Sequence, residues 1–287
     1  MNNTPLEDAL VLATKALLPI AGERARFEAR LLMGHVLGVD PSSLGLTHTV
    51  PLTSPQMEAL ERALERRLAH EPISRIIGKR AFWTFEFEIS PHTLDPRPDS
   101  ETLVEAVLAR VAKDAPGRIV DFGTGSGCLL ISILSERKNL TGVGVDISQG
   151  ALDVATRNAR ACGVAERTQF LCTDWDAGVS GPFDIIISNP PYIPHQDVGG
   201  LAEDVKNFDP LDALTPGPSG LEAYTRLATA CARLLSPHGF CAMEIGQGQE
   251  EDVARLFEAQ GLHPTAQHKD LQGITRCLVF ERKPCTS

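Results

Sequence analysis

From Arg118 onward, short apolar runs alternate with longer segments of helical periodicity, and this alternation constrains the possible folds more than any other feature of the chain. It is typical of a mostly parallel sheet covered by helices. The sequence therefore predicts an α/β domain whose sheet is closed by its last strand. The expected strands are Ile119–Phe122, Val143–Asp146, Thr168–Cys172, Asp184–Ile187, Gly239–Ile245 and Thr275–Phe280, and the expected helices are Cys128–Glu136, Ala151–Cys162, Gly220–Leu235 and Glu250–Gln260.

The first part of the chain instead repeats apolar residues every three or four positions, which is the spacing of amphipathic helices. Ser54-Pro55 adds a helix-start signal, because proline is favoured at the first helical position. We interpret residues 1–75 as a small helical bundle. Its expected apolar positions are Leu6, Leu10, Ala13 and Leu17, then Phe27, Leu31, Leu32 and Val36, and finally Met57, Leu60, Leu64 and Leu68.

Between the two parts, Phe85, Phe87 and Ile89 alternate with glutamates, a pattern that predicts a half-buried strand. We assign this strand to a hairpin over residues 76–92. The hairpin would link the bundle to an α/β domain that spans residues 93–287.

The chain of 287 residues carries a net charge of −10, and about −9 of it falls after Ser90. A protein that holds many phosphates usually shows the opposite sign near its active face, so the charge disfavours direct binding of nucleic acid. No apolar run is long enough to span a bilayer, and Glu7, Asp8 and Lys15 interrupt the start of the chain. We expect a cytoplasmic protein without a signal peptide or a membrane partner.

The cysteines and histidines show no metal-binding pattern. The seven cysteines are odd in number and include no C-x-x-C pair, and the eight histidines are scattered singly. Such cysteines are typical of a reducing compartment rather than of a disulfide or zinc framework. We therefore expect no metal site.

A short turn, Asn189-Pro190-Pro191-Tyr192, follows the apolar run at 183–187 and carries the clearest chemistry. Ligands in open α/β sheets bind at the carboxyl ends of strands. The prolines have no N–H and stiffen the backbone, so the Asn189 side-chain oxygen and the Pro190 carbonyl can each accept one N–H of a planar –NH₂ group. Tyr192 offers a flat face for stacking. We therefore assign the whole turn to substrate binding, Asn189, Pro190 and Tyr192 to catalysis, and Asn189 to cofactor binding as well.

A glycine-rich loop lies between the first expected strand and its helix, and we assign its residues to cofactor binding: Gly123, Thr124, Gly125, Ser126 and Gly127. Glycines let a backbone turn sharply and let a ligand approach closely. Cys128 stands where the dinucleotide fingerprint G-x-G-x-x-G has its last glycine, and this departure argues against NAD.

Two more strand ends complete a candidate pocket for adenosine. Asp146, followed by Ile147, can accept both ribose hydroxyls, and Asp174-Trp175 can supply an acceptor for the adenine amino group and an aromatic wall. Such a pocket without a pyrophosphate site fits S-adenosylmethionine. Together with the Asn-Pro-Pro-Tyr turn, the residues alone predict S-adenosylmethionine-dependent methylation of a planar nitrogen.

At this point the sequence resembles a known family, the protein-(glutamine-N5) methyltransferases that modify peptide chain release factors. The resemblance spans nearly the whole chain. This sequence departs from the family pattern at three places. It has Asp95 where the family usually has an aliphatic residue and Asp99-Ser100 where the family favours Glu-Thr. It also has Phe208-Asp209 in place of the commoner Tyr-Glu. The matching segments are LDPRPDSE at 94–101, FGTGSG, VD, TDW, SNPPYI, the FDP region at 208–221, MEIG-x-x-Q at 243–249 and D-x-x-G-x-x-R at 270–276.

The resemblance implies a class I methyltransferase fold with an antiparallel last strand. It also implies that the substrate is the glutamine of a Gly-Gly-Gln motif in class 1 release factors, and that the N-terminal bundle docks this partner. We expect a monomer.

Several alternatives stay open at the level of sequence. Asn-Pro-Pro-Tyr can be an ordinary turn, and the glycine loop can serve another nucleotide. An adenine-N6 methyltransferase would use the same turn, but it would act on an extruded base from a basic groove. Glutamine methylation of a ribosomal protein and a non-catalytic binding module are the remaining alternatives.

Overall fold

The computed structural model describes residues 4–45 and 50–283, which form two compact units. One unit contains the described residues up to Lys79 together with residues 202–208, and the other contains residues 80–201 and 209–283. Each unit has its own apolar core. None of the helices in the described part of the chain is long and apolar enough to cross a membrane.

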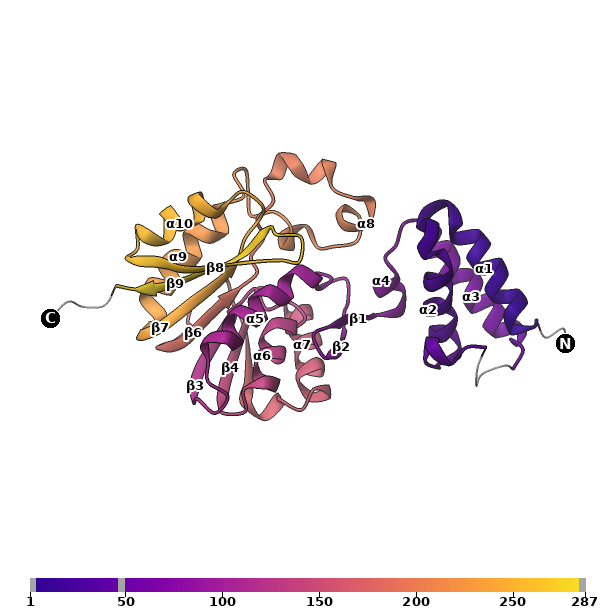
Figure 1. Ribbon diagram of the computed structural model, residues 1–287, viewed down its shortest axis with the longest axis horizontal. Coiled ribbons are helices and arrows are strands. Elements are labelled where there is room, and N and C mark those ends of the chain that lie inside the picture. The colour runs from indigo at the N-terminus through magenta and orange to yellow at the C-terminus, as the bar shows by residue number, and fades with distance from the viewer. Residues whose placement is uncertain (1–3, 46–49, 284–287) are drawn as a thin grey trace. The chain divides into compact units, whose positions relative to one another are not determined.

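The larger unit is built on a seven-stranded sheet in the order β5-β4-β3-β6-β7-β9-β8. Figure 1 shows the last strand in sequence, β9, lying between β7 and β8. The first five strands pair in parallel, and β9 is antiparallel to both of its neighbours. The strands are β3 (Gly117–Phe122), β4 (Leu140–Asp146), β5 (Thr168–Cys172), β6 (Phe183–Ser188), β7 (Leu235–Glu244), β8 (Leu262–Lys269) and β9 (Thr275–Arg282).

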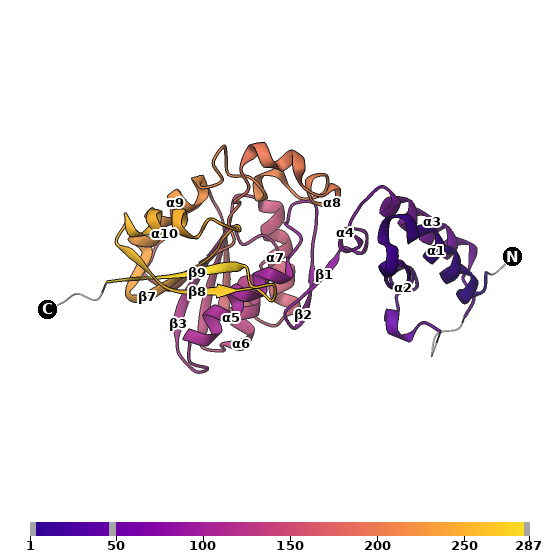
Figure 2. The ribbon, with the colours of Figure 1, turned by 45° about the horizontal axis from the view of Figure 1, so that its top comes forward.

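Helices cover both faces of this sheet (Figure 2). Successive residues of a strand point to opposite faces, and β3 follows this rule. Ile119 packs on the side of α5, α6 and α7, whereas Val120 and Phe122 pack on the side of α9 and α10. The helices of the unit are α5 (Glu101–Arg110), α6 (Cys128–Glu136), α7 (Gln149–Ala161), α9 (Glu222–Leu234) and α10 (Glu250–Glu258).

The mostly parallel sheet with one antiparallel strand confirms the predicted fold class. One detail of the prediction is wrong, because β9 does not close the sheet. The edge is formed by β8, which the sequence analysis did not find. Most β8 residues after Leu262 are exposed or half-buried, so the strand has no apolar run that would mark it.

The smaller unit is a helical bundle, with α4 (Ile73–Ile77) after its three longer helices, and it also includes the short α8 (Glu203–Lys206). Leu6, Leu10, Ala13 and Leu17 form the buried stripe of α1, as predicted. The longer helices are α1 (Leu6–Ala21), α2 (Ala25–Leu37) and α3 (Ser54–Leu68).

The buried faces of α2 and α3 differ from the predicted ones. Phe27 is 63% exposed and Leu68 is 41% exposed. Their places in the core are taken by small residues, such as Ala29 of α2 and Ala63 of α3, and by Arg67. The Arg67 side chain lies almost fully inside because its Nε donates to the Glu28 carboxylate at 2.8 Å.

A hairpin of β1 (Lys79–Phe82) and β2 (Phe85–Glu88) precedes the large sheet. Asn158 of α7 holds β2 in place, since it accepts from the Glu88 N–H at 2.8 Å and donates to the Glu88 carbonyl at 3.0 Å. The same amide group also donates to the Ser126 carbonyl at 2.9 Å. Asn158 thereby connects the hairpin to the glycine-rich loop.

Candidate active site

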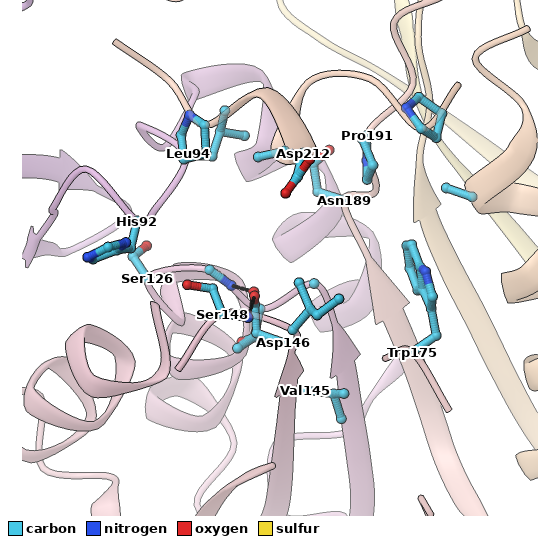
Figure 3. A pocket seen from close by; sticks show the side chains of 18 of the residues that line it. His92, Leu94, Ser126, Val145, Asp146, Ser148, Trp175, Asn189, Pro191 and Asp212 are labelled. Atoms are coloured by element: carbon cyan, nitrogen blue, oxygen red, sulfur yellow. Dashed lines mark hydrogen bonds between the residues drawn. The ribbon is translucent and has the colours of Figure 1, made fainter. Parts of the chain in front are cut away.

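A cavity of about 480 Å³ opens at the carboxyl ends of the parallel strands. In Figure 3, Asn189, Pro191 and Asp212 lie on one side of this cavity, and Val145, Asp146 and Ser148 lie on the other. The size suits a small-molecule ligand. The cavity is lined from the glycine-rich loop, the ends of β4, β5 and β6, the 91–100 loop and the segment 210–216.

The glycine-rich loop forms one wall of the cavity. Gly123 and Gly125 have φ angles of +71° and +55°, and a Cβ atom on either would meet no atom within 4 Å. The loop therefore presents open backbone to the cavity, as close approach of a ligand requires. Gly127 differs, because it does not line the cavity, and a Cβ there would lie 2.8 Å from Ile131 Cδ1.

Asp146 lies at the end of β4 and closes the glycine-rich loop from the side. One carboxylate oxygen accepts the Gly125 N–H at 2.8 Å, and the other accepts the Ser148 N–H at 2.9 Å. Burial raises the pKa of the Asp146 carboxyl, and these backbone hydrogen bonds oppose the rise. Each carboxylate oxygen has two lone pairs, so Asp146 keeps acceptor capacity for hydroxyl groups of a ligand. This arrangement fits the ribose of an adenosyl group.

Asp121 supports the same loop from inside the protein. Its Oδ2 accepts the Thr124 hydroxyl at 2.7 Å, and its Oδ1 has no hydrogen-bond partner among residues 4–45 and 50–283. Burial raises the Asp121 pKa to about 7. The sequence analysis did not assign this residue to the site.

Trp175 and Ile147 line the cavity, as does Asp174. The Asp174 carboxylate is already engaged, because Arg226 donates to both of its oxygens at 3.0 Å. Both side chains are about half exposed. The expected contact of Asp174 with an adenine amino group stays a prediction, and it would have to use the lone pairs that Arg226 leaves.

The Asn-Pro-Pro-Tyr turn begins where β6 ends, and its residues face different directions. Asn189 and Pro191 line the large cavity. Pro190 is buried and is not among the lining residues. Tyr192 instead lines a second, smaller hollow together with Gly246 and Gln249, and its carbonyl accepts from Gln249 Nε2 at 3.0 Å.

The Asn189 side chain is held by residues that the sequence analysis did not assign to the site. Its Nδ2 donates to Ser100 Oγ at 3.1 Å. Glu244, at the end of β7, lies close enough to Ser100 and Asn189 for both side chains to lower its pKa. These residues lie far apart in sequence, and only the segments quoted for the family resemblance contain them.

Two loops that cover the cavity are joined to each other. Arg97 donates to Asp209 Oδ2 at 2.6 Å, and the Asp95 N–H donates to the other oxygen of the same carboxylate at 3.3 Å. Beyond Asp209 the chain continues along the cavity wall. The lining residues there, which the sequence analysis did not name, are Pro210, Asp212, Ala213, Thr215 and Pro216.

Within residues 4–45 and 50–283 there is no group of three or more His, Cys, Asp or Glu residues that could hold a metal ion. The six cysteines in these ranges are free thiols, and Cys285 lies outside the described residues.

The fold and the adenosine-compatible cavity define a class I S-adenosylmethionine-dependent methyltransferase, and S-adenosylmethionine is the cofactor of this class. The comparisons with known proteins agree. The PrmC N-terminal domain family matches residues 8–78, and the methyltransferase small domain family matches residues 95–204. The chain belongs to the release factor glutamine methyltransferase family.

A relative from Rhodospirillum rubrum named release factor glutamine methyltransferase is 50% identical over 93% of this chain and 82% of its own length. A protein of the same name from Cereibacter sphaeroides is 40% identical over 96% of this chain and 98% of its own. Among solved structures, a methyltransferase from Pyrococcus furiosus superposes with a TM-score of 0.51 at 16% identity, covering 77% of this chain and 98% of its own. That likeness supports the fold alone.

Proposed function

We propose that this protein transfers a methyl group from S-adenosylmethionine to the side-chain amide N5 of the glutamine in the Gly-Gly-Gln motif of class 1 peptide chain release factors. The observation that carries the proposal is the 50% identity with the Rhodospirillum rubrum relative over 93% of this chain. The cavity at the strand ends and the amide-holding turn beside it supply the matching chemistry.

The residues that would hold the cofactor come from three strand ends. Asp146 would accept the ribose hydroxyls, the open backbone at Gly123 and Gly125 would admit the ligand closely, and Trp175 and Ile147 would contact the base. When bound, S-adenosylmethionine supplies a methyl group made electrophilic by its sulfonium. The other contributions come from the protein's own side chains.

An amide nitrogen is a poor nucleophile because its lone pair is delocalised into the carbonyl. We propose that Asn189 Oδ1 and the Pro190 carbonyl each accept one N–H of the target amide, and that Tyr192 limits rotation of the amide plane. Two positions support these roles. Asn189 lies on the cavity wall, and Tyr192, three residues later, lines the neighbouring smaller hollow. Such positioning with preorganised acceptors accounts for large rate gains.

The nitrogen must also lose a proton, and we assign no dedicated base to this step because methylation makes the nitrogen strongly acidic. The nearest hydroxyl of the turn does not suit the role of a base. Burial raises the Tyr192 pKa to about 12, so this side chain stays protonated at neutral pH. Water can accept the proton.

We further propose that the helical unit docks the release factor, and that the protein acts as a monomer in the cytoplasm without nucleic acid as a substrate. The match of residues 8–78 to a dedicated N-terminal domain family supports a separate role for this unit. The net charge of −10 supports a protein partner over nucleic acid.

The test is to incubate the purified protein with methyl-labelled S-adenosylmethionine and a class 1 release factor, its Gly-Gly-Ala variant, ribosomal protein or DNA in separate reactions. We expect label only in the unmodified release factor, and mass spectrometry should place it on the glutamine. Equal labelling of the Gly-Gly-Ala variant, or preferred labelling of DNA or ribosomal protein, would refute the proposal.

A further inference from the structure

A buried polar cluster adjoins Asn189, with Ser100 at the edge of the cavity and Glu244 outside its lining. Ser188 of β6 pairs with Met243 of β7 in parallel register, so Asn189 and Glu244 follow side by side at the ends of adjacent strands. Glu244 is 2% exposed, and Ser100 of the 91–100 loop is 3% exposed. The proposed reaction has so far given neither residue a role.

The cluster determines which way the Asn189 amide faces. Its Nδ2 donates to Ser100 Oγ at 3.1 Å, and the Glu244 carboxyl lies close enough to both Asn189 and Ser100 for their side chains to lower its pKa. An ionised carboxylate accepts hydrogen bonds and cannot donate them. Ser100 Oγ accepts from the amide and the Glu244 carboxylate lies beside it, so the –NH₂ end of the amide suits this side better than the oxygen end.

The oxygen end of Asn189 is therefore left for a ligand. Within residues 4–45 and 50–283, no group donates a hydrogen bond to Asn189 Oδ1, and the residue lines the cavity. A rotated amide would set its oxygen against the Glu244 carboxylate and lose the hydrogen bond to Ser100. Loss of a buried hydrogen bond and placement of the amide oxygen against a carboxylate are both costly, so the cluster favours one orientation.

From this geometry we propose that Ser100 and Glu244 are positioning residues, which hold Asn189 with Oδ1 toward the target amide. The inference rests on the proposed function, since it concerns the same transfer. It adds two residues that we expect to act through Asn189 rather than on the methyl group or the target nitrogen.

The Glu244 carboxyl is incompletely hydrogen-bonded and has a raised pKa. Its Oε2 has no hydrogen-bond partner among the described residues, and burial raises its pKa to about 7. Arg276 lowers this pKa and Asp99 raises it, while Arg276 is in turn shared between Asp99 and Asp270 at 2.9 Å each. Other titratable groups in electrostatic contact with Glu244 are Tyr192, Tyr224, Cys128 and Cys277.

The direction of the pH effect follows from the acceptor role. The ionised form of Glu244 is the stronger acceptor, and a pKa near 7 means that this form is lost as the pH falls below neutrality. The kcat should therefore fall on the acid side of about pH 7. A residue that only supports the fold would give no such limb in kcat.

The experiment compares Ser100→Ala, Ser100→Thr and Glu244→Gln with the unmodified protein, using release factor as substrate. As a matched control, Ser236→Ala removes another mostly buried hydroxyl, which hydrogen-bonds Asp184 away from the cavity. The readouts are kcat and KM for the release factor, the pH profile of kcat, and affinity for S-adenosylhomocysteine by calorimetry.

We expect Ser100→Ala to lower kcat about tenfold and Glu244→Gln about 100-fold, because the glutamine –NH₂ can face the Asn189 oxygen and stabilise the rotated amide. Ser100→Thr should restore most of the activity, and Ser236→Ala should change nothing. The acid limb should disappear in Glu244→Gln. Affinity for S-adenosylhomocysteine should be unchanged throughout.

Two results would overturn the inference: full kcat in both Ser100→Ala and Glu244→Gln, or a parallel loss of kcat and S-adenosylhomocysteine affinity. If Glu244→Gln does not fold, Ser100→Ala and the pH profile of the unmodified protein decide the matter. An unmodified protein that leaves release factor unlabelled refutes the proposed function instead, so the two failures can be told apart.

Discussion

Two buried glutamates, one in each unit of this protein, differ in how completely their carboxylates are paired. In the helical unit, Glu28 is paired with Arg67 Nε at 2.8 Å, and Arg24 approaches its other oxygen at 3.6 Å. In the α/β unit, Glu244 is also buried but has one oxygen without a partner in the described part of the chain, and Asp146 accepts only backbone N–H groups.

This difference in pairing distinguishes carboxylates that serve the packing of the fold from carboxylates that serve its function. A buried carboxylate whose partners are complete stabilises a fold once it has formed, and it offers nothing to a ligand. Buried carboxyls with open acceptor positions are costly to keep, and they cluster at functional sites. We therefore expect substitutions at fully paired buried carboxylates to change stability. Substitutions at carboxylates with open acceptor positions should change ligand binding or turnover.

The largest effect should come from Asn189→Ala, which removes the proposed acceptor at the reacting nitrogen. We expect kcat to fall about 100- to 1,000-fold, as for the loss of one preorganised group in a catalytic site. Cofactor affinity, measured by calorimetry, should change little. Asn139→Ala, at an exposed asparagine that donates to the Asp114 carbonyl, is the matched control. Equal losses in kcat and in cofactor affinity would contradict this role of Asn189 and weaken the contrast between the two units.

Arg67→Ala should come next, and it should act on stability. Removing one member of a buried ion pair leaves the other uncompensated, so we expect a loss of about 3 kcal/mol in the unfolding free energy of the helical unit. Its neighbour Arg66 forms a more exposed pair with Glu71, and Arg66→Ala should cost less than about 1 kcal/mol. Denaturant unfolding measures both. Similar values for the two variants would show that burial does not distinguish these pairs.

Asp146→Ala should weaken S-adenosylhomocysteine binding about 10- to 100-fold, the range for hydrogen bonds to a charged group. The kcat at saturating cofactor should change much less. The matched control is Asp153→Ala, on the exposed side of α7, which changes the net charge by the same amount and leaves the cavity intact. Unchanged affinity on titration would remove Asp146 from the cofactor site.

The smallest effect on stability should come from Phe27→Ser. The side chain is 63% exposed, so we expect a change within about 0.5 kcal/mol in denaturant unfolding. If the helical unit docks the release factor through this face, KM for the factor should rise while kcat holds. A marked loss of stability would mean that Phe27 contributes to the core after all.

The sequence predicted the α/β unit well because buried parallel strands carry continuous apolar runs. Ile185, Ile186 and Ile187 of β6 are all buried, so the run marks the strand on both faces. An edge strand is not constrained in this way. For that reason β8, with exposed residues and Pro264, could not be recognised from apolar character.

In the helical unit the sequence predicted helices but not their inner faces. Helical periodicity allows several faces when small and large apolar residues are mixed. The core uses Ala25 and Ala29 of α2, and small side chains permit close contact between helices, whereas the larger Phe27 points outward. An arginine inside the core, Arg67, is outside what hydrophobicity can indicate.

The residues of the candidate site also differ in whether the sequence could predict them. Asp146 and Asn189 could be predicted because each follows a recognisable strand at the edge where ligands bind. Ser100 could not, since it precedes Asn189 by 89 residues and lies at the start of a helix, away from any strand end. Pro190 and Tyr192 were predicted as part of the site, but the sequence could not indicate that they lie outside the wall of the large cavity.

The order of the strands has a consequence for how the site is completed during folding. The strand β9 follows β8 in the chain, yet it lies between β7 and β8 and carries Arg276, which pairs with Asp99. Until β9 has docked, one side of β7 has no neighbour and Glu244 lacks this covering. Methyl transfer therefore requires the insertion of β9 between two strands that precede it in the chain.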